Sequence, residues 1–422
     1  MVGLMDLGGS LLMATVAQMA WNEIRSPINK LKKDLKKTFE VLGVGTKDRK
    51  GVIVLPIVKD VKPRPYGYDI VILLPNGIPP EVFHKIRPCI MSCVDGDFEV
   101  IPTGNRHVTL RCYTQYIPMK IKFKEEMLMQ TEGLKVPFLV GRTSAGLTYL
   151  DLHEKNLLIG GMPGSGKSNL INLSLTVLKM LRPKTYIGYV DMKSNGVEAQ
   201  KFEGKLDTAT DLMGAGRLIK EGLGEVHRRG KLFTKPNIKA LNIEEYNKKS
   251  EEKLEYHVLV IDEFSLLSPH LEKGGKTNEI KMFKEELYRD LITIASQGRA
   301  FGIVLIIATQ RPSKEVFDGL LKAQFHYTTA FRVRNRVNSG ILLDNDRAAE
   351  LENVPGRCIV QADGLDLKCQ VPYMSSDTVR VLLSDFEVET ITVNNNIQVI
   401  SEALEEEFVD IGWGSEAEWN EA

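Results

Sequence analysis

The clearest pattern in the sequence is a series of short apolar runs that alternate with segments of helical periodicity. The runs are nearly continuous in Val, Ile, Leu and small residues, as in strands that are buried on both faces. Alternation of such runs with helices is typical of a parallel sheet covered by helices. The runs are NLLIGG, TYIGYVDM, HVLVIDEF, GIVLIIATQ, HYTTAFRV and RCIVQ. We therefore predict an α/β domain over residues 136–376 with a central, mostly parallel sheet.

Residues 51–130 show a different pattern, in which short β-rich runs are separated by Gly, Pro and Asn. The runs are GVIVLPIV, YDIVILLP, FEVIP and RHVTLRCYT. Between them, PPEVFHKIRPCIMSCV predicts a helix that opens with Pro in its first turn. We predict a small α+β domain, an adaptor or ring-stacking module, and we find no catalytic constellation in it.

The N-terminal segment, residues 1–50, combines an apolar run at 7–22 with a Lys-rich stretch at 23–50. A membrane-spanning helix needs about 20 apolar residues, and this run is shorter and contains Ser10, Thr15 and Gln18. No basic region precedes it, so a secretory signal is not indicated. Two interpretations stay open for the run: an amphipathic helix packed on protein, and a weak anchor at a membrane surface. The Lys-rich stretch predicts either a solvated helix or a patch that contacts phosphate or anionic lipid.

The C-terminal segment, residues 377–422, is predicted to be a solvated acidic tail. From Ser401 onward it holds eight acidic residues and no Lys or Arg. For the whole chain the formal net charge is zero, so any surface that binds nucleic acid has to be local. The five cysteines are an odd number without zinc-site spacing, which indicates reduced thiols in the cytoplasm. We expect a cytoplasmic protein, with the inner face of the cell membrane as an alternative location.

One motif carries the strongest chemical signal. Residues 161–168, GMPGSGKS, fit the G-x-x-x-x-G-K-[ST] pattern, between a predicted strand and a predicted helix. Glycines let several backbone N–H groups turn toward phosphate oxygens, and the start of a helix adds its positive dipole end. Lys167 is predicted to reach the β- and γ-phosphates of ATP, and the Ser168 hydroxyl to bind Mg²⁺. The predicted nucleotide-binding residues are Gly161, Met162, Pro163, Gly164, Ser165, Gly166, Lys167, Ser168 and Asn169.

Two further apolar runs end in polar residues suited to hydrolysis. HVLVIDE ends in Asp262, predicted to hold Mg²⁺ through its water shell, and Glu263, predicted to be the general base. GIVLIIATQ ends in Gln310, which can sense the γ-phosphate or orient the attacking water. Arg299 precedes that run and is predicted to act on the nucleotide of a neighbouring subunit, with Arg332 as a rival. Either arginine could instead form a structural ion pair.

The combination goes beyond a generic phosphate-binding loop. Five segments of the chain, taken in order, resemble the FtsK/SpoIIIE family of DNA-pumping ATPases. They are GMPGSGKSNL, YVDMKSNGVE, HVLVIDEF, GRAFGIVLIIATQRPS and FRVRNRVNSGILLDNDRAAEL. The resemblance covers residues 136–376. It implies a RecA-like P-loop NTPase core, a hexameric ring and ATP-driven movement along double-stranded DNA. It also implies nucleotide roles for Gly164, Gly166, Lys167, Ser168, Asp262, Glu263 and Gln310.

The resemblance also narrows the cellular role. Cell-division members carry membrane spans ahead of the motor and a winged-helix domain after it, and we expect neither in this chain. The ending GRCIVQADGLDLKCQVPYM is similar to relatives from conjugative elements, which act as coupling proteins. We therefore predict a coupling protein for conjugative DNA transfer, with a relaxase or transfer-channel proteins as partners. The alternatives are a secretion-system docking ATPase for protein substrates and a segregation or packaging motor. For DNA contact, Lys273 and Lys276 lie in a Gly-rich basic segment that predicts either a pore loop or an ordinary surface loop.

Overall fold

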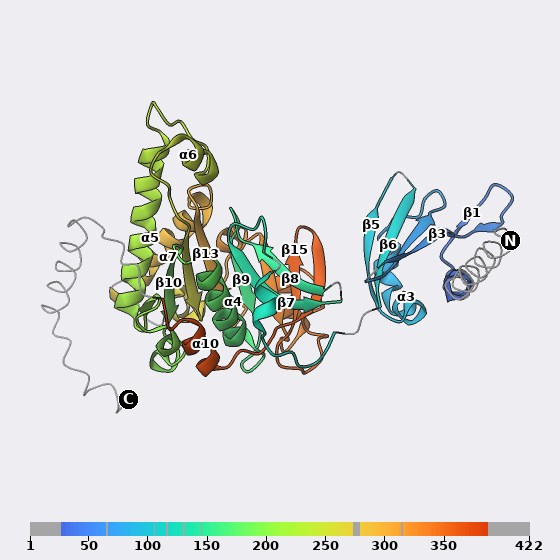
Figure 1. Cartoon of the computed structure of the whole chain (residues 1–422). Helices are drawn as coiled ribbons and strands as arrows, with labels where there is room; N and C mark the ends of the chain where they lie inside the picture. The colour runs from blue at the N-terminus through green and yellow to red at the C-terminus, as the bar shows by residue number, and fades with distance from the viewer. Residues whose placement is uncertain are drawn as a thin grey trace, which may run out of the picture. The chain divides into compact units, whose positions relative to one another are not determined.

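The computed structural model describes residues 27–64, 66–104, 106–114, 117–129, 131–144, 146–272, 279–313 and 315–386. The apolar run at 7–22 and the acidic segment from Ser401 lie outside these residues. The chain divides into two compact units (Figure 1). The first comprises residues up to Pro118 together with Arg142–Gly146, and the second comprises Met119–Gly141 and the residues from Leu147 onward. Each unit is described by itself.

The first unit is a small α+β module built on an antiparallel sheet. Its four strands are ordered β3-β4-β6-β5, and a short hairpin, β1-β2, forms a separate sheet. A helix covers residues 27–41. The remaining elements are β1 (Thr46–Lys47), β2 (Ile53–Val54), β3 (Ile57–Arg64), β4 (Gly67–Leu73), α2 (Val82–Lys85), α3 (Arg87–Val94), β5 (Asp97–Pro102) and β6 (His107–Tyr113).

The helix over residues 27–41 belongs to the core of this unit. Leu31, Leu35 and Phe39 recur every four residues and therefore form one buried stripe along the helix. They pack in the same cluster as Ile70 of β4 and Phe83 of α2. The predicted boundary at residue 50 is therefore not a boundary of the fold. The lysines that dominate this segment's composition are solvated, but three apolar positions are enough to fix the helix on the module.

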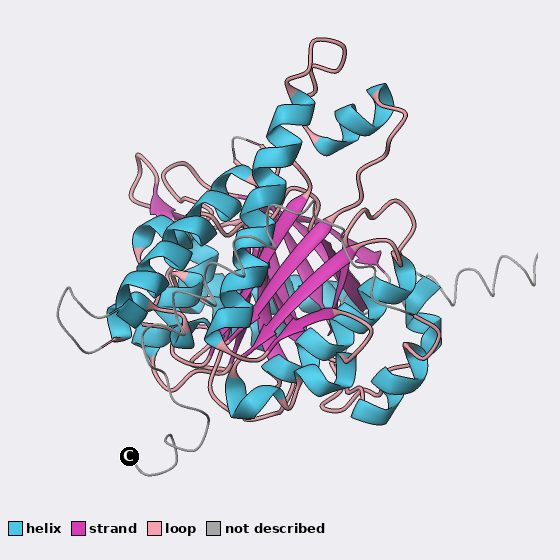
Figure 2. Ribbon diagram, turned by 90° about the vertical axis from the view of Figure 1, so that its left-hand side faces the viewer, coloured by secondary structure: helices cyan, strands magenta, loops and turns pink. Residues whose placement is uncertain are grey.

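The second unit contains a ten-stranded sheet, ordered β11-β10-β12-β13-β9-β14-β15-β16-β7-β8. Figure 2 shows this sheet in magenta among the helices. The six strands from β11 to β14 are parallel, whereas β15 pairs antiparallel with both β14 and β16. The strands are β7 (Pro137–Thr143), β8 (Gly146–Asp151), β9 (Leu157–Gly160), β10 (Tyr186–Asp191), β11 (Asp207–Ala209), β12 (His257–Asp262), β13 (Ile303–Thr309), β14 (Tyr327–Phe331), β15 (Arg357–Ala362) and β16 (Leu365–Gln370). All six predicted runs form strands, and the mostly parallel sheet is confirmed.

Helices cover both faces of this sheet. They are α4 (Lys167–Leu181), α5 (Leu212–Phe233), α6 (Ile243–Lys249), α7 (Glu279–Gln297), α8 (Gly319–Lys322), α9 (Arg336–Leu343) and α10 (Ser376–Leu382). Shorter 3₁₀ turns are η1 (Glu125–Met129), η2 (Lys193–Gly196), η3 (Ala199–Phe202), η4 (Phe264–Leu266) and η5 (Pro269–Leu271). Within the described residues, none of the helices has the length and apolar character needed to cross a membrane.

Strand β12 shows why its sequence is apolar at every position. Val258 and Val260 face the cluster that contains the buried side of α4. Leu259 and Ile261 face the other cluster, which contains α5 and α7. Successive side chains of a strand point to opposite faces, so a strand covered on both faces needs no polar alternation.

The second unit extends beyond the predicted limits at both ends. The N–H of Phe123 donates to Tyr373 O at 3.0 Å, and the Tyr149 hydroxyl donates to Met127 O at 2.7 Å. Residues 119–129 therefore belong to this unit. The predicted boundary at 130 had assigned them to the small module. At the other end, Val379 of α10 is buried in the cluster of α4.

Candidate active site

The candidate site forms because the parallel strands end in register at one edge of the sheet. Gly160, the last residue of β9, pairs with Thr309, the last residue of β13. Ala308 of β13 pairs with Asp262, the last residue of β12, and Asp262 pairs with Asp191 at the end of β10. Strand β13 therefore lies between the strand that leads into the phosphate-binding loop and the strand that ends in the acid pair. The two motifs meet at the carboxyl edge, where open α/β sheets bind ligands.

The loop between β9 and α4 has the backbone that phosphate binding needs. Gly161 and Gly166 have φ values of 153° and 112°, in the region that favours glycine. A Cβ on Gly166 would lie 2.8 Å from the N atom of Gly356, because the loop before β15 packs directly on the phosphate-binding loop. The N–H of Gly356 also donates to Ser165 O at 2.8 Å. The C-terminal part of the sheet therefore holds this loop in shape.

Helix α4 begins at Lys167, and no side chain caps its N-terminus. The first amides of the helix are thus available to phosphate oxygens, as the sequence predicts. The Lys167 side chain is buried, and its ammonium donates to Gly161 O at 2.6 Å and to Met162 O at 2.9 Å. Burial, followed by repulsion from the ammonium of Lys193, lowers the pKa of Lys167 to about 8. A phosphate group would stabilise the charged form of this lysine.

Asn169 is also predicted to bind nucleotide, and its side chain makes a structural contact. Its side-chain amide donates to Pro372 O at 2.9 Å and accepts from the N–H of Met374 at 3.0 Å. These two bonds join the first turn of α4 to the chain that leaves β16. In this structure the Asn169 side chain is therefore committed to the protein backbone.

The acid pair is buried at the end of β12. Asp262 is fully buried, and its Oδ1 accepts a hydrogen bond from Lys193 Nζ at 2.6 Å. Burial raises the pKa of Asp262 and outweighs the opposing effect of Lys193. Glu263 has a left-handed backbone, with φ of 74°, which is rare for a residue with a side chain. This turn directs its carboxylate back toward the end of β13.

Glu263 is held by donors from β13 and from its own turn. Its carboxylate accepts the N–H of Gln310 at 3.0 and 3.1 Å, the Thr309 hydroxyl at 3.1 Å and the Ser265 hydroxyl at 2.5 Å. The Gln310 backbone thus positions the general base that the sequence predicts. The Gln310 side chain lines the adjoining cavity.

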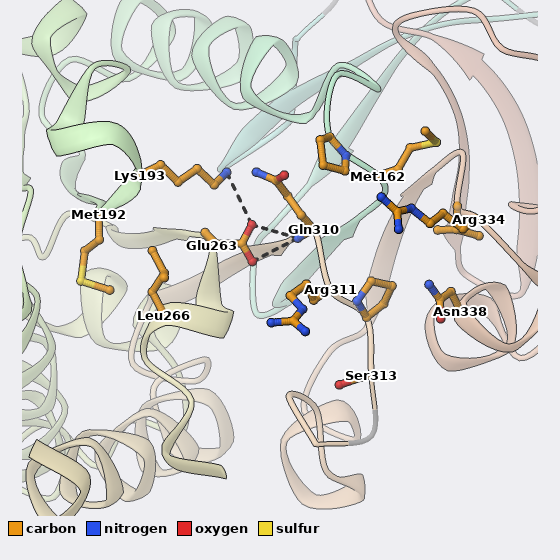
Figure 3. A pocket seen from close by; sticks show the side chains of 13 residues that line it. Met162, Met192, Lys193, Glu263, Leu266, Gln310, Arg311, Ser313, Arg334 and Asn338 are labelled. Atoms are coloured by element: carbon orange, nitrogen blue, oxygen red, sulfur yellow. Dashed lines mark hydrogen bonds and ion pairs between the residues drawn. The ribbon is translucent and has the colours of Figure 1, made fainter. Parts of the chain in front are cut away.

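A cavity of about 730 Å³ opens in front of these groups (Figure 3). Met162 and Pro163 of the phosphate-binding loop form part of its wall, together with Lys193, Glu263 and Gln310. Figure 3 shows the Lys193 ammonium directed toward the Glu263 carboxylate, with Gln310 beside them. Arg311 and Arg334 also line the cavity, and both are exposed. The cavity therefore combines a carboxylate, a polar amide and three cations.

The residues present fit a magnesium ion bound together with a nucleotide. Among the described residues there is no group of three or more His, Cys, Asp or Glu that could hold a metal by itself. Asp262 Oδ2, however, is buried without a hydrogen-bond partner, which leaves a carboxylate oxygen for the water shell of an ion. Magnesium typically takes only one or two protein oxygens and completes its shell with water and phosphate. Asp262 and the Ser168 hydroxyl are the predicted ligands.

The structure does not bring every predicted residue to this site. Arg299 precedes β13, at the opposite end of the strand from Thr309, and seven residues of strand span about 20 Å. Its Nη1 lies 2.5 Å from His326 Nε2. The rival Arg332 is nearer, since its carbonyl accepts the N–H of Met162 at 2.9 Å. Lys273 and Lys276 lie outside the described residues, so their DNA contact stays a prediction.

Three cations of the site were not predicted: Lys193, Arg311 and Arg334. Each follows a strand of the parallel sheet at its carboxyl end, after β10, β13 and β14 respectively. Their position after predicted strands can be read from the sequence. In the sequence, however, each looks like an ordinary basic residue in a loop, because only the strand order shows that the carboxyl ends of these three strands surround one cavity.

The same motifs identify relatives among known proteins. The chain is 29% identical to the DNA translocase FtsK of Chlamydia muridarum over 289 residues, which is 64% of this chain and 35% of the relative. It is 32% identical to the FtsK of Bacillus cereus over 271 residues, 60% of this chain and 31% of the relative. The resemblance to FtsK DNA translocases is confirmed. With the FtsK of Oceanobacillus iheyensis the similarity reaches 94% of this chain, at 28% identity.

The chain spans 31% to 49% of the length of these three FtsK relatives. No protein-family model matches the sequence.

Among solved structures, the pCW3 conjugation coupling protein TcpA, in its monomer form with ATPγS, has a TM-score of 0.59 at 24% identity. The match covers 84% of this chain and 99% of that protein, and it confirms the fold of a P-loop ATPase.

Proposed function

We propose that this chain is a magnesium-dependent ATPase that moves double-stranded DNA. One observation carries the proposal. The register of β9, β13 and β12 brings the loop around Lys167 and the pair Asp262–Glu263 to the same edge of the sheet, in front of one cavity. A triphosphate on the loop would extend its γ-phosphoryl group toward Glu263 and Gln310.

The site residues would divide the work of hydrolysis among them. The loop amides and Lys167 bind the phosphates and offset their charge. Ser168 and Asp262 would hold magnesium, which would supply further neutralisation of the phosphoryl charge. Glu263 accepts the proton of the attacking water, and the Gln310 amide orients that water. The buried position of Glu263 and its donors from β13 keep the carboxylate in place for this step.

Double-stranded DNA is the proposed substrate because the relatives that share these motifs bear the name DNA translocase. We expect duplex DNA to raise the steady-state rate of ATP hydrolysis severalfold, since a motor couples turnover to its track. Backbone contacts dominate such binding, so the DNA needed for half-maximal stimulation should rise steeply with salt. For about six phosphate contacts the rise is about 10³-fold between about 50 mM and about 200 mM salt. A coupled phosphate-release assay measures both quantities.

Two controls accompany this measurement. Heparin, a polyanion without a duplex, should not reproduce the stimulation, and the Lys167→Ala protein should report any contaminating ATPase. A rate that saturating duplex leaves unchanged would contradict the translocase proposal. Stimulation by a secreted protein substrate instead would favour a secretion-system docking ATPase.

We further propose that the chain works as a ring in which Arg299 acts on the neighbouring subunit. Ring assembly would then be unnecessary for binding ATP but required for turnover.

 
The position of Arg299 supports action in trans, because about 20 Å of strand separates it from the site in its own subunit. Hexameric rings are implied by the FtsK resemblance. An arginine from the next subunit would stabilise the charge that spreads over the γ-phosphoryl oxygens during transfer.

Mixed rings test this arrangement. Arg299→Ala and Glu263→Ala subunits should each be inactive alone, whereas a mixture should recover part of the activity. In the mixture, an Arg299→Ala site with an intact general base can receive Arg299 from a Glu263→Ala neighbour. A mixture of Lys167→Ala and Glu263→Ala subunits is the matched control and should stay inactive, because every site lacks a residue of its own. If rings shown to contain both variants recover no activity, Arg332 would become the candidate for the arginine that acts on the neighbouring nucleotide.

The cellular role we propose is that of a coupling protein in conjugative DNA transfer. The support is the likeness in fold to the conjugation coupling protein TcpA, which extends over 99% of that protein. A relaxase and the proteins of a transfer channel would then be partners, and contact with the inner face of the membrane would follow. Pull-down of a relaxase from the same mobile element tests this role. A chromosome-segregation or packaging motor is the outcome that a negative result would favour.

A further inference from the structure

Lys193 lies at the centre of the candidate site without a role in the mechanism above. It follows Asp191, the last residue of β10, and begins the 3₁₀ turn η2. Its Nζ is 2.6 Å from Asp262 Oδ1 and 3.9 Å from Glu263 Oε2. The side chain is only 17% exposed and lines the cavity beside Gln310. An ammonium group therefore lies between the two acids that the mechanism uses.

Both ends of this lysine are fixed by buried carboxylates. Asp191 is fully buried, and its Oδ1 accepts the N–H of Lys193 at 3.1 Å, while its Oδ2 accepts the N–H groups of Glu198 and Ala199. Asp191 thus shapes the turn, and Asp262 holds the tip of the side chain. A lysine fixed in this way loses little conformational entropy when it binds a further group.

The ammonium of Lys193 also has donors to spare. A lysine ammonium has three N–H donors. Within the described part of the chain, Asp262 Oδ1 is the one acceptor within hydrogen-bond distance of Lys193 Nζ, since the Glu263 oxygen at 3.9 Å is too far. The group faces a cavity whose wall includes Met162 and Pro163 of the phosphate-binding loop. An anion bound at the phosphate-binding loop and extending into this cavity could accept hydrogen bonds from the remaining N–H groups of the Lys193 ammonium.

We propose that Lys193 is a second phosphate-binding lysine, which contacts the γ-phosphoryl group and distinguishes ATP from ADP. This inference rests on the proposed nucleotide site. Lys167 serves the loop end of the triphosphate, and Lys193 serves the end that faces Glu263. ADP lacks the γ-phosphoryl group, so the contact with Lys193 would be made by the triphosphate alone. A purely structural ion pair with Asp262 is the competing explanation.

Nucleotide binding without DNA separates the two explanations. We would measure the affinities of Lys193→Met and unmodified protein for ADP and for ATPγS by fluorescence competition, with magnesium and with excess EDTA. Loss of one charged hydrogen bond should weaken ATPγS binding by about 10-fold or more. Binding of ADP should change little. The difference should persist in EDTA, because the contact is made directly by the ammonium.

The matched control is Lys201→Met. Lys201 is similarly buried, with a side chain 14% exposed, and it is ion-paired with Glu198 outside the cavity. It should leave the ratio of the two affinities unchanged. Lys193→Arg keeps a cation and should restore part of the preference for ATPγS over ADP. This variant also provides a test if Lys193→Met fails to fold.

Two results would overturn the inference. One is an unchanged ratio of ATPγS to ADP affinity in Lys193→Met, whether both affinities stay the same or both fall equally. A ratio that changes only when magnesium is present would show that Lys193 acts through Asp262 and the ion. Failure of the unmodified protein to bind either nucleotide would instead contradict the proposed function, so the two failures can be told apart.

Discussion

Replacement of Lys167 with Ala is expected to lower the rate of ATP hydrolysis by at least about 10²-fold, the typical effect of removing one donor to a reacting group. The Lys167 ammonium is buried beside the loop and donates to two of its carbonyls. Its loss removes the ammonium that is predicted to contact the β- and γ-phosphates, and it also leaves the carbonyls of Gly161 and Met162 without this donor. Steady-state phosphate release, with circular dichroism to verify the fold, measures the effect.

Lys179→Ala is the matched control for this variant. Lys179 lies on the same helix, is equally buried and donates its ammonium to a backbone carbonyl, that of Pro183, at 2.7 Å. Its replacement should lower thermal stability while the hydrolysis rate of the folded protein stays close to that of the unmodified chain. Turnover near the unmodified rate in a folded Lys167→Ala protein would contradict the assignment of the phosphate site.

Glu263→Gln should produce the second large effect. The amide cannot accept a proton, so hydrolysis should fall by about 10²- to 10⁴-fold, the usual contribution of general base catalysis. The side chain keeps its size and one carbonyl oxygen, which can still accept the N–H of Gln310. Nucleotide binding should therefore persist, and single-turnover experiments should show bound ATP that is not cleaved. This combination distinguishes loss of the base from loss of the site.

Glu244→Gln controls for the removal of an ion-paired carboxylate elsewhere in the same unit. Glu244 contacts Lys135 and the Tyr256 hydroxyl near α6, away from the cavity. Its replacement should leave both binding and cleavage intact. Cleavage by Glu263→Gln at the unmodified single-turnover rate would show that another group activates the water.

The strands and the two motifs of the candidate site could be predicted because their signals are local. A strand buried on both faces is apolar at every position, and a phosphate-binding loop needs its glycines, Lys167 and Ser168 within eight consecutive residues. Parallel strands deliver their carboxyl ends to one edge, so the approach of Asp262 and Glu263 to the loop followed from the same pattern.

Interactions between distant segments required the tertiary structure. Lys193 gains its place only because β10 pairs with β12, which brings it to Asp262, 69 residues away in the sequence. Asn169 lies beside a phosphate-binding motif, yet its amide is used by the backbone of Pro372 and Met374. The sequence by itself determined which elements form and which residues can do chemistry, because periodicity and motifs act over a few residues. The order of strands in the sheet decided which side chains share the cavity, because that order depends on packing across the whole domain.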